Sequence, residues 1–167
     1  LGAIYELDRD GDITPRLFEN LNNRFYRSSG VGKFLTMIYG EITEAGTFRF
    51  LSAAHPMPVV FSGLYDRFVD ISDDLLIRFP PIGTLPSRKD IDRSMSPSVL
   101  GFKREYEINE ITLMGSGDIL LLYSDGLADH SRDGEPYFPD RLESRLREVK
   151  DRSAREISEA VKEDVFE

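Results

Sequence analysis

The order of patterns along this chain predicts an α+β fold of mostly antiparallel sheets with flanking helices. Extended patterns occupy the stretch between residues 34 and 123, and helical patterns follow from residue 140 onward. Strands and helices that occur in separate runs are typical of α+β domains rather than of alternating α/β domains. A chain of 167 residues with 40% hydrophobic content can build its own core, so a single domain over residues 1–167 is the expectation.

A helix is expected near the beginning of the sequence. Thr14 is placed to cap it and Pro15 suits the first helical position, and a polar stretch at residues 27–30 ends it. Between them, apolar residues recur at helical spacing. They are Leu17, Phe18, Leu21 and Phe25.

Two hairpins are expected next. Residues 34–42 and 47–54 are extended patterns that flank a loop containing Gly46, which predicts an antiparallel pair. Residues 59–61 and 67–71, separated by a Ser-Gly turn, predict a second pair.

Residues 73–101 carry several prolines and little periodicity, which predicts an irregular connection. Two interpretations stay open: a solvated crossover between strands, or a flap near a site that recognises a protein substrate, rather than a core element. Four basic residues give this segment positive charge. They are Arg78, Arg88, Lys89 and Arg93.

The last third predicts two strands and two helices. Residues 102–108 alternate as a half-exposed strand, and a Gly-Asp turn then feeds an apolar run at residues 119–123. Residues 140–149 predict one helix, and Ser153 with Glu156 predicts the capping box of another. The second helix presents an apolar face made of Ile157, Ala160, Val161 and Val165.

Asp125 is the main candidate for a functional residue. The run at residues 119–123 is too short for an amphipathic helix, so we expect a strand covered on both faces that ends close to Asp125 and Gly126. One interpretation is a surface Asp-Gly turn. The other is a divalent-metal ligand that is solvent-accessible at the rim of a sheet, with Ser124 and the Gly126 backbone as neighbours.

Composition excludes several other classes. Thirty acidic and 21 basic residues give a net charge of −9, which argues against nucleic acid or an anionic membrane as partner. The absence of cysteine excludes disulfides and thiolate sites, and is compatible with a cytoplasmic location. We find no apolar run long enough for a membrane span, and no leader segment, in the sequence.

Other motifs fail on their most demanding positions. Acidic residues 8, 10 and 12 alternate as in a calcium loop, but Ile13 stands where that loop needs glycine. Residues 29–33 imitate a phosphate loop, but Phe34 follows the lysine where serine or threonine is required. No Gly-x-Ser-x-Gly elbow occurs. We expect His55 to be a hydrogen-bonded structural histidine and His130 to lie at the surface.

Three elements in order resemble one known family. Residues 117–126, Gly-Asp-Ile-Leu-Leu-Leu-Tyr-Ser-Asp-Gly, with Gly-Glu-Pro-Tyr-Phe at 134–138, resemble the strand and metal-aspartate motif of stage II sporulation protein E. Residues 34–40 are similar to the family's phenylalanine-x-threonine strand. Residues 51–58 are similar to its asparagine-alanine-glycine-histidine-x-proline-proline element, with Ala53 and Ala54 replacing the usual asparagine and glycine.

The resemblance implies a bacterial serine/threonine phosphatase of the protein phosphatase 2C type, built as part of an α/β/β/α sandwich. Such an enzyme uses two Mn²⁺ or Mg²⁺ ions to activate water against a phosphoserine or phosphothreonine. Asp125 and Gly126 are the metal-site residues that carry over, with Asp125 also the catalytic position. The implied partners are phosphorylated anti-sigma-factor antagonists in stress or developmental signalling, including sporulation, and a homodimer is compatible with these expectations.

The chain departs from the family pattern at both ends. The family's aspartate-x-serine-glycine-histidine-glycine loop is not found, and the acidic segment that leads into its last strand is expected only after Glu167. We therefore expect a phosphatase-like domain that lacks these two segments. The alternatives are a catalytically incomplete module that acts by protein binding, and a non-phosphatase α+β binding domain.

Overall fold

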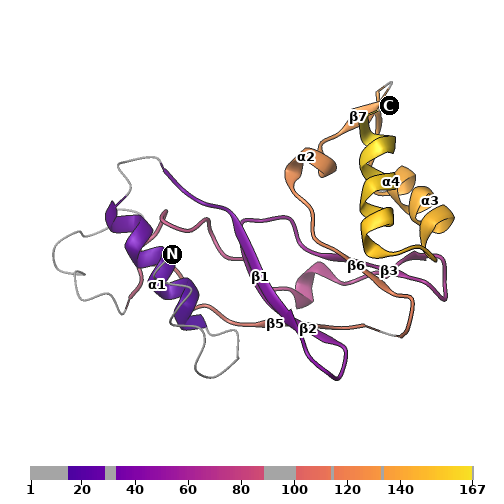
Figure 1. Ribbon diagram of the computed structural model, residues 1–167. Helices are drawn as coiled ribbons and strands as arrows, with labels where there is room; N and C mark the ends of the chain where they lie inside the picture. Colours follow the sequence, from indigo (N-terminus) through magenta and orange to yellow (C-terminus); the bar gives the residue numbers. More distant parts are fainter. Residues whose placement is uncertain (1–14, 29–32, 89–100, 114, 133, 167) are drawn as a thin grey trace. The chain divides into compact units, whose positions relative to one another are not determined.

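The computed structural model describes residues 15–28, 33–88, 101–113, 115–132 and 134–166. The chain forms two compact units, one of Leu1–His55 with Asp74–Ile111 and one of Pro56–Asp73 with Thr112–Glu167 (Figure 1). Both contain helices and antiparallel strand pairs, so the predicted α+β class is confirmed. The single domain and the layer order of a sandwich stay predictions.

The first unit packs one helix on a three-stranded sheet. The sheet has the order β1-β2-β5, with β1 at Met37–Ile42, β2 at Thr47–Ala53 and β5 at Asn109–Thr112. Helix α1 (Pro15–Ser28) begins at the predicted proline and inserts its apolar stripe into the same core as β2. Thr14, the predicted cap, lies outside the described residues. The buried members of this core are Leu17, Phe18, Leu51, Ala53, Phe79, Ile82 and Tyr106.

The predicted first hairpin is confirmed. Its register runs from Met37 opposite Ala53 to Ile42 opposite Phe48. The loop closes because Gly46 N–H donates to the Thr43 carbonyl at 2.9 Å, with Gly46 at a φ of 78° that suits glycine. Strand β2 buries consecutive residues from Phe50 to Ala53, which is the pattern of a strand covered on both faces.

Residues 76–88 of the irregular segment do not form a flap, which is one of the two interpretations left open for residues 73–101. After a 3₁₀ helix, η2 (Asp73–Leu75), the chain buries Phe79 and Ile82 in the core of the first unit. Backbone bridges join Phe79 to Ala53 and Ile82 to Leu35. Residues 76–88 are therefore part of a core rather than a flap, because apolar side chains between the prolines pack against β2. The recognition role of the arginines in this segment stays a prediction. Residues 89–100 lie outside the described part.

The strand predicted at residues 102–108 is also wrong, since regular pairing begins only at Asn109. A buried lysine connects residues 102–108 to the core of the first unit. Lys103 Nζ donates to the Glu19 carboxylate of α1 and lies 3.7 Å from the centroid of the Tyr106 ring. Burial lowers the pKa of Lys103, against the opposing effect of Glu19. A buried ion pair of this kind fixes the backbone near Lys103. The alternation of polar and apolar residues that predicted a strand gives no sign of this pair.

The second unit has a short sheet of order β4-β3-β6, with β3 at Val59–Ser62, β4 at Arg67–Phe68 and β6 at Ile119–Leu121. The predicted second hairpin is therefore confirmed. Helices α3 (Asp140–Val149) and α4 (Ala154–Phe166) share its core. Two small elements, α2 (Asp125–Ala128) and the hairpin of β7 (Ser131–Arg132) and β8 (Glu135–Pro136), lie between β6 and α3 in the chain. The buried members of the core are Phe61, Tyr137, Leu142, Leu146, Val149, Ile157 and Ala160.

A carboxylate and two glycines join β3 to β6. Asp118 accepts the Gly63 N–H through Oδ1 at 3.2 Å and the Gly115 N–H through Oδ2 at 3.0 Å. A Cβ on Gly63 would lie 2.5 Å from the Gly117 carbonyl oxygen, so only glycine permits this approach. Gly117 itself has a φ of 92°. The Gly-Asp turn therefore sets the register in which Val59 faces Leu121.

Side chains of α3 cap the outer edge of β4. Glu143 Oε2 accepts the Phe68 N–H at 2.7 Å, and Arg147 Nε donates to the Asp66 carbonyl at 2.6 Å. Lys150 Nζ donates to the Gly63 carbonyl at 3.1 Å and pairs with the Asp66 carboxylate. These bonds satisfy edge groups that otherwise could pair with another strand.

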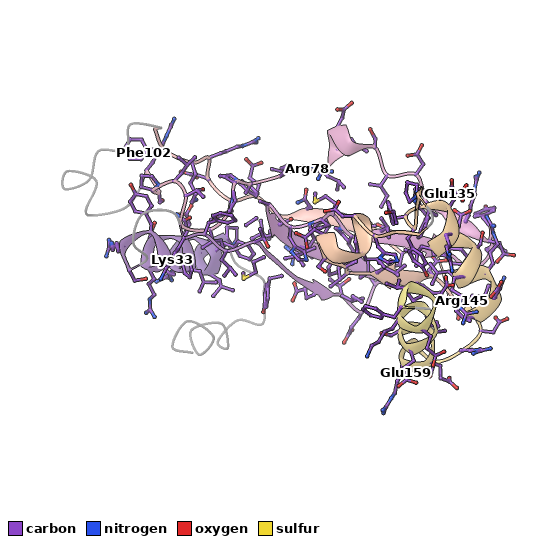
Figure 2. The ribbon with its side chains drawn as sticks, turned by 90° about the horizontal axis from the view of Figure 1, so that it is seen from above. Lys33, Arg78, Phe102, Glu135, Arg145 and Glu159 are labelled. Atoms are coloured by element: carbon purple, nitrogen blue, oxygen red, sulfur yellow. The ribbon has the colours of Figure 1, made fainter. Side chains whose placement is uncertain are left out.

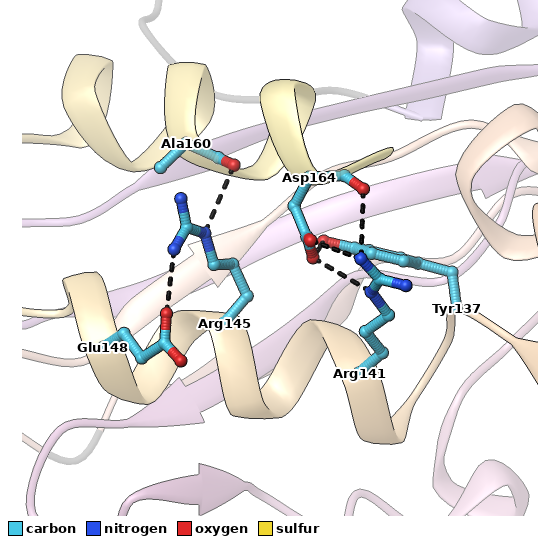
Figure 3. A network of polar contacts seen from close by, with 6 residues as sticks. All are labelled: Tyr137, Arg141, Arg145, Glu148, Ala160 and Asp164. Atoms are coloured by element: carbon cyan, nitrogen blue, oxygen red, sulfur yellow. Dashed lines mark hydrogen bonds and ion pairs between the residues drawn. The ribbon is translucent and has the colours of Figure 1, made fainter. Parts of the chain in front are cut away.

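A polar clamp joins α4 to α3 (Figure 3). Asp164 accepts from the Tyr137 hydroxyl at 2.9 Å and from Arg141 Nη2 at 2.5 Å, and Arg145 Nε donates to the Ala160 carbonyl at 3.3 Å. The hydrogen bonds from Arg141 hold the pKa of Asp164 below its usual range. The buried Tyr137 thus has a partner for its hydroxyl, as an interior tyrosine requires.

The predicted capping box opens α4. The Ser153 hydroxyl donates to Glu156 Oε2 at 2.6 Å, and the Ser153 N–H donates to the same oxygen at 3.0 Å. These bonds lower the pKa of Glu156. Ile157 and Ala160 are buried on the face that the sequence predicts.

We predict that Gly63→Ala destabilises the second unit by about 1–3 kcal/mol, because the new methyl group must displace backbone rather than a side chain. Urea unfolding followed by circular dichroism measures the change. Gly115→Ala is the matched control, since a Cβ there meets nothing within 4 Å. Equal losses in the two variants would contradict a close approach between Gly63 and Gly117.

Asp164→Asn is expected to lower the free energy of unfolding by about 1–2 kcal/mol at pH 7, through the loss of charge-assisted bonds to Arg141. Because the folded-state pKa of Asp164 is depressed, its contribution is complete above the unfolded pKa of about 3.9 and is lost as the pH falls through the folded pKa. The difference between variant and parent should therefore shrink below about pH 4. Urea unfolding at pH 3 to 7 tests this.

Glu159→Gln is the control on the same helix, because its ion pair with Arg155 is largely exposed and contributes about 0.5 kcal/mol or less. A pH-independent difference for Asp164→Asn would rule out the charged clamp.

Candidate functional site

Asp125 lies four residues beyond the end of β6. The ladder with β3 stops at Leu121, and the next residue, Leu122, is 54% exposed. Strand β6 is therefore shorter than the predicted run, because its partner strand β3 begins at Val59. The residues of β6 are half-buried, so the strand is not covered on both faces as predicted. Asp125 is the first residue of α2 and is exposed, as expected for a ligand at the rim of a sheet.

The neighbours of Asp125 leave space around its carboxylate. Asp125 Oδ1 accepts the Gly126 N–H at 2.9 Å, and within the described residues Oδ2 has no hydrogen-bond partner. A Cβ built on Gly126 meets only the Ser124 hydroxyl at 3.6 Å, so packing does not demand glycine there. Ser124 occupies the N-cap position without a side-chain capping bond. One carboxylate oxygen is thus available to a ligand from solvent.

Side chains on both sides of Asp125 fix its loop to the second unit. The Tyr123 ring stacks on Phe138, with centroids 5.3 Å apart and planes 25° apart. On the other side, Leu127 packs against the buried core. The Tyr137 N–H donates to the His130 carbonyl at 2.8 Å and closes the loop. Asp125 is therefore exposed but held by its flanking residues.

The small-residue element before His55 has a strained backbone. Ala54 has a φ of 50°, in the left-handed region that favours glycine. Counted back from His55, Ala54 takes the family's glycine position and Ser52 its asparagine position, so our assignment of Ala53 to the asparagine was wrong by one residue. Ser52 keeps a polar role, since its hydroxyl donates to the His55 carbonyl at 3.0 Å.

The two histidines have different contacts. His55 is half-buried, and its Nδ1 has no hydrogen-bond partner in the described part of the chain, whereas we expected a hydrogen-bonded ring. His130 is half-buried, and its ring packs edge-to-face on Tyr137 at 5.9 Å.

The predicted recognition residues are only partly described. Arg78 and Arg88 are exposed, and Arg78 is labelled in Figure 2. Lys89 and Arg93 lie outside the described residues, as do the acidic residues 8, 10 and 12 and most of the segment 29–33.

The described carboxylates do not by themselves form a two-metal site. Asp125 offers the oxygen chemistry that Mn²⁺ and Mg²⁺ prefer, but each ion takes about six ligands. Within the described ranges, no three histidine or acidic side chains lie close enough together to hold an ion. The residues present thus fit one ligand position, not the pair of ions that the resemblance implies.

Two residues close to Asp125 in the sequence make contacts that local patterns did not predict. The Gly-Asp pattern at Asp118 predicts a turn, and in the structure its carboxylate also binds backbone N–H groups of Gly63 and Gly115. The sequence pattern predicts that Tyr123 belongs to a buried strand. In the structure its ring stacks on Phe138, 15 positions later, and no local pattern predicts this contact.

One family model matches this sequence over its full length. Residues 1–167 match the family model described as stage II sporulation protein E (SpoIIE), and the chain belongs to this family. Domains of this family are related to phosphatases of the protein phosphatase 2C type, which are typically metal-dependent. No curated protein and no solved structure matched the sequence. Among the described residues, no helix combines the length and apolar character needed to cross a membrane.

Proposed function

We propose that this chain belongs to the phosphatase domain of a metal-dependent serine/threonine protein phosphatase, with Asp125 as a metal ligand. The observation that carries the proposal is the position of Asp125 within a SpoIIE-family chain: an exposed carboxylate on a loop that two flanking side chains hold. Such a carboxylate suits a hard cation, because it is rigidly presented and keeps one oxygen unengaged.

The proposed substrate is a phosphoserine or phosphothreonine on a regulatory protein. By family analogy the substrate protein is an anti-sigma-factor antagonist, and the setting is bacterial sporulation or stress signalling in the cytoplasm. Exposed Arg78 and Arg88 support an acidic, phosphorylated partner, because guanidinium groups bind phosphate and carboxylate oxygens in bidentate fashion.

A second function, a phosphatase-like module that acts by binding a protein, is favoured by one observation. In the part of the chain that the structure describes, Asp125 does not belong to any group of three or more acidic or histidine side chains that could hold a metal ion. In that case the chain binds its partner without hydrolysing it, and the two functions differ in turnover.

We predict that Asp125→Asn weakens Mn²⁺ binding by at least about tenfold, because an amide oxygen is a poorer ligand than a carboxylate for a hard cation. Isothermal titration with MnCl₂ measures the affinity. Asp151→Asn is the matched control, since Asp151 is an exposed aspartate in the turn between α3 and α4. Unchanged Mn²⁺ affinity in Asp125→Asn would overturn the metal-ligand assignment.

We also predict little hydrolysis of p-nitrophenyl phosphate by the 167-residue chain with Mn²⁺, because one recognised carboxylate cannot hold two ions. Release of p-nitrophenolate is followed by absorbance. Robust turnover that Asp125→Ala abolishes would show that other acids in the chain complete the site, and would exclude the binding module.

A further inference from the structure

The backbone that carries Asp125 is not held by the sheet. Strand pairing ends with Val59 opposite Leu121, and Leu122 turns its side chain to solvent. Residues 122–124 therefore extend past the last ladder hydrogen bond before α2 begins. Another contact must determine where this stretch lies.

One contact that ties this stretch to the second unit is an aromatic stack. The Tyr123 ring lies almost parallel to Phe138, at 5.3 Å between centroids. Phe138 is itself 5.9 Å from Phe68 of β4, and Phe68 packs edge-to-face on the buried Phe61 of β3 at 6.0 Å. A continuous row of rings thus connects the residue two positions before Asp125 to the buried centre of the second unit.

We propose that Tyr123 is a positioning residue, whose ring, stacked on Phe138, fixes the backbone that presents Asp125. This proposal rests on the proposed function, in which Asp125 is a ligand. The ring contributes through the face that stacks on Phe138. Leu127 anchors the other side of Asp125, so loss of Tyr123 frees one end of the loop and leaves the other attached.

The first measurement needs no metal. Backbone ¹⁵N relaxation of the whole chain reports the order parameter of Gly126. We expect a value of about 0.85 in the parent and below about 0.6 in Tyr123→Ala. Tyr123→Phe should restore the parent value, because it keeps the ring. Leu146→Ala is the control: it removes a fully buried side chain of the same core at a position outside residues 122–130, and should leave Gly126 ordered.

The second measurement connects position to function. Mn²⁺ broadens amide signals near its site, and the concentration for half-maximal broadening of Gly126 should rise about tenfold in Tyr123→Ala, with recovery in Tyr123→Phe. If Gly126 stays ordered in Tyr123→Ala, or moves equally in Leu146→Ala, the positioning role is wrong. If the loop loosens as expected but Asp125→Asn binds Mn²⁺ like the parent, the positioning role holds and the ligand assignment fails.

Discussion

The carboxylate of Asp118 is the constraint on which the second unit depends most. It accepts two backbone N–H groups, one from the β3–β4 turn and one from the turn that precedes β6. A three-residue strand has few ladder bonds of its own, so its register relies on side-chain contacts at its ends. Asp118 supplies that contact where β6 starts, and the absence of a side chain on Gly63 lets the two turns meet. A shift of one residue here would reverse the faces of the sheet on which the side chains of β6 lie.

The same short sheet needs protection along its outer edge, and α3 provides it. Glu143 and Arg147, four residues apart on one helix face, bind each other and also bind backbone groups of the β4 hairpin. The helix therefore buries its apolar face in the core with Leu142 and Leu146, while its polar side chains occupy the edge of the strand. Asp164 of α4 then joins α3 through Arg141, so both helices are coupled to the strands by charged groups as well as by packing.

Sequence predicts the elements whose signals are local and misses contacts between distant residues. The start of α1 at Pro15, the first hairpin, the bounds of α3 and the capping box at Ser153 follow from periodicity and capping chemistry within a few residues. The early end of β6 at Leu121 depends on where β3 begins, at Val59, 62 residues earlier in the chain. The burial of Lys103 depends on Glu19, 84 positions away. At the candidate site, Asp125 and its exposure were predicted, whereas its supports, Asp118 and Tyr123, act through partners that no local pattern reveals.

The net charge of −9 acts in opposite directions on the two ligands that the proposed function requires. A negative field raises the local concentration of Mn²⁺ or Mg²⁺ near an exposed carboxylate, and it repels a phosphorylated, acidic partner. At physiological ionic strength the Debye length is about 8 Å, so the repulsion is screened over most of the surface and the charges nearest the phosphate decide its binding. Guanidinium groups that contact the phosphate itself can therefore offset an unfavourable total charge locally. A chain that is acidic overall yet carries exposed guanidinium groups is thus compatible with both a cation and a phosphoprotein as ligands.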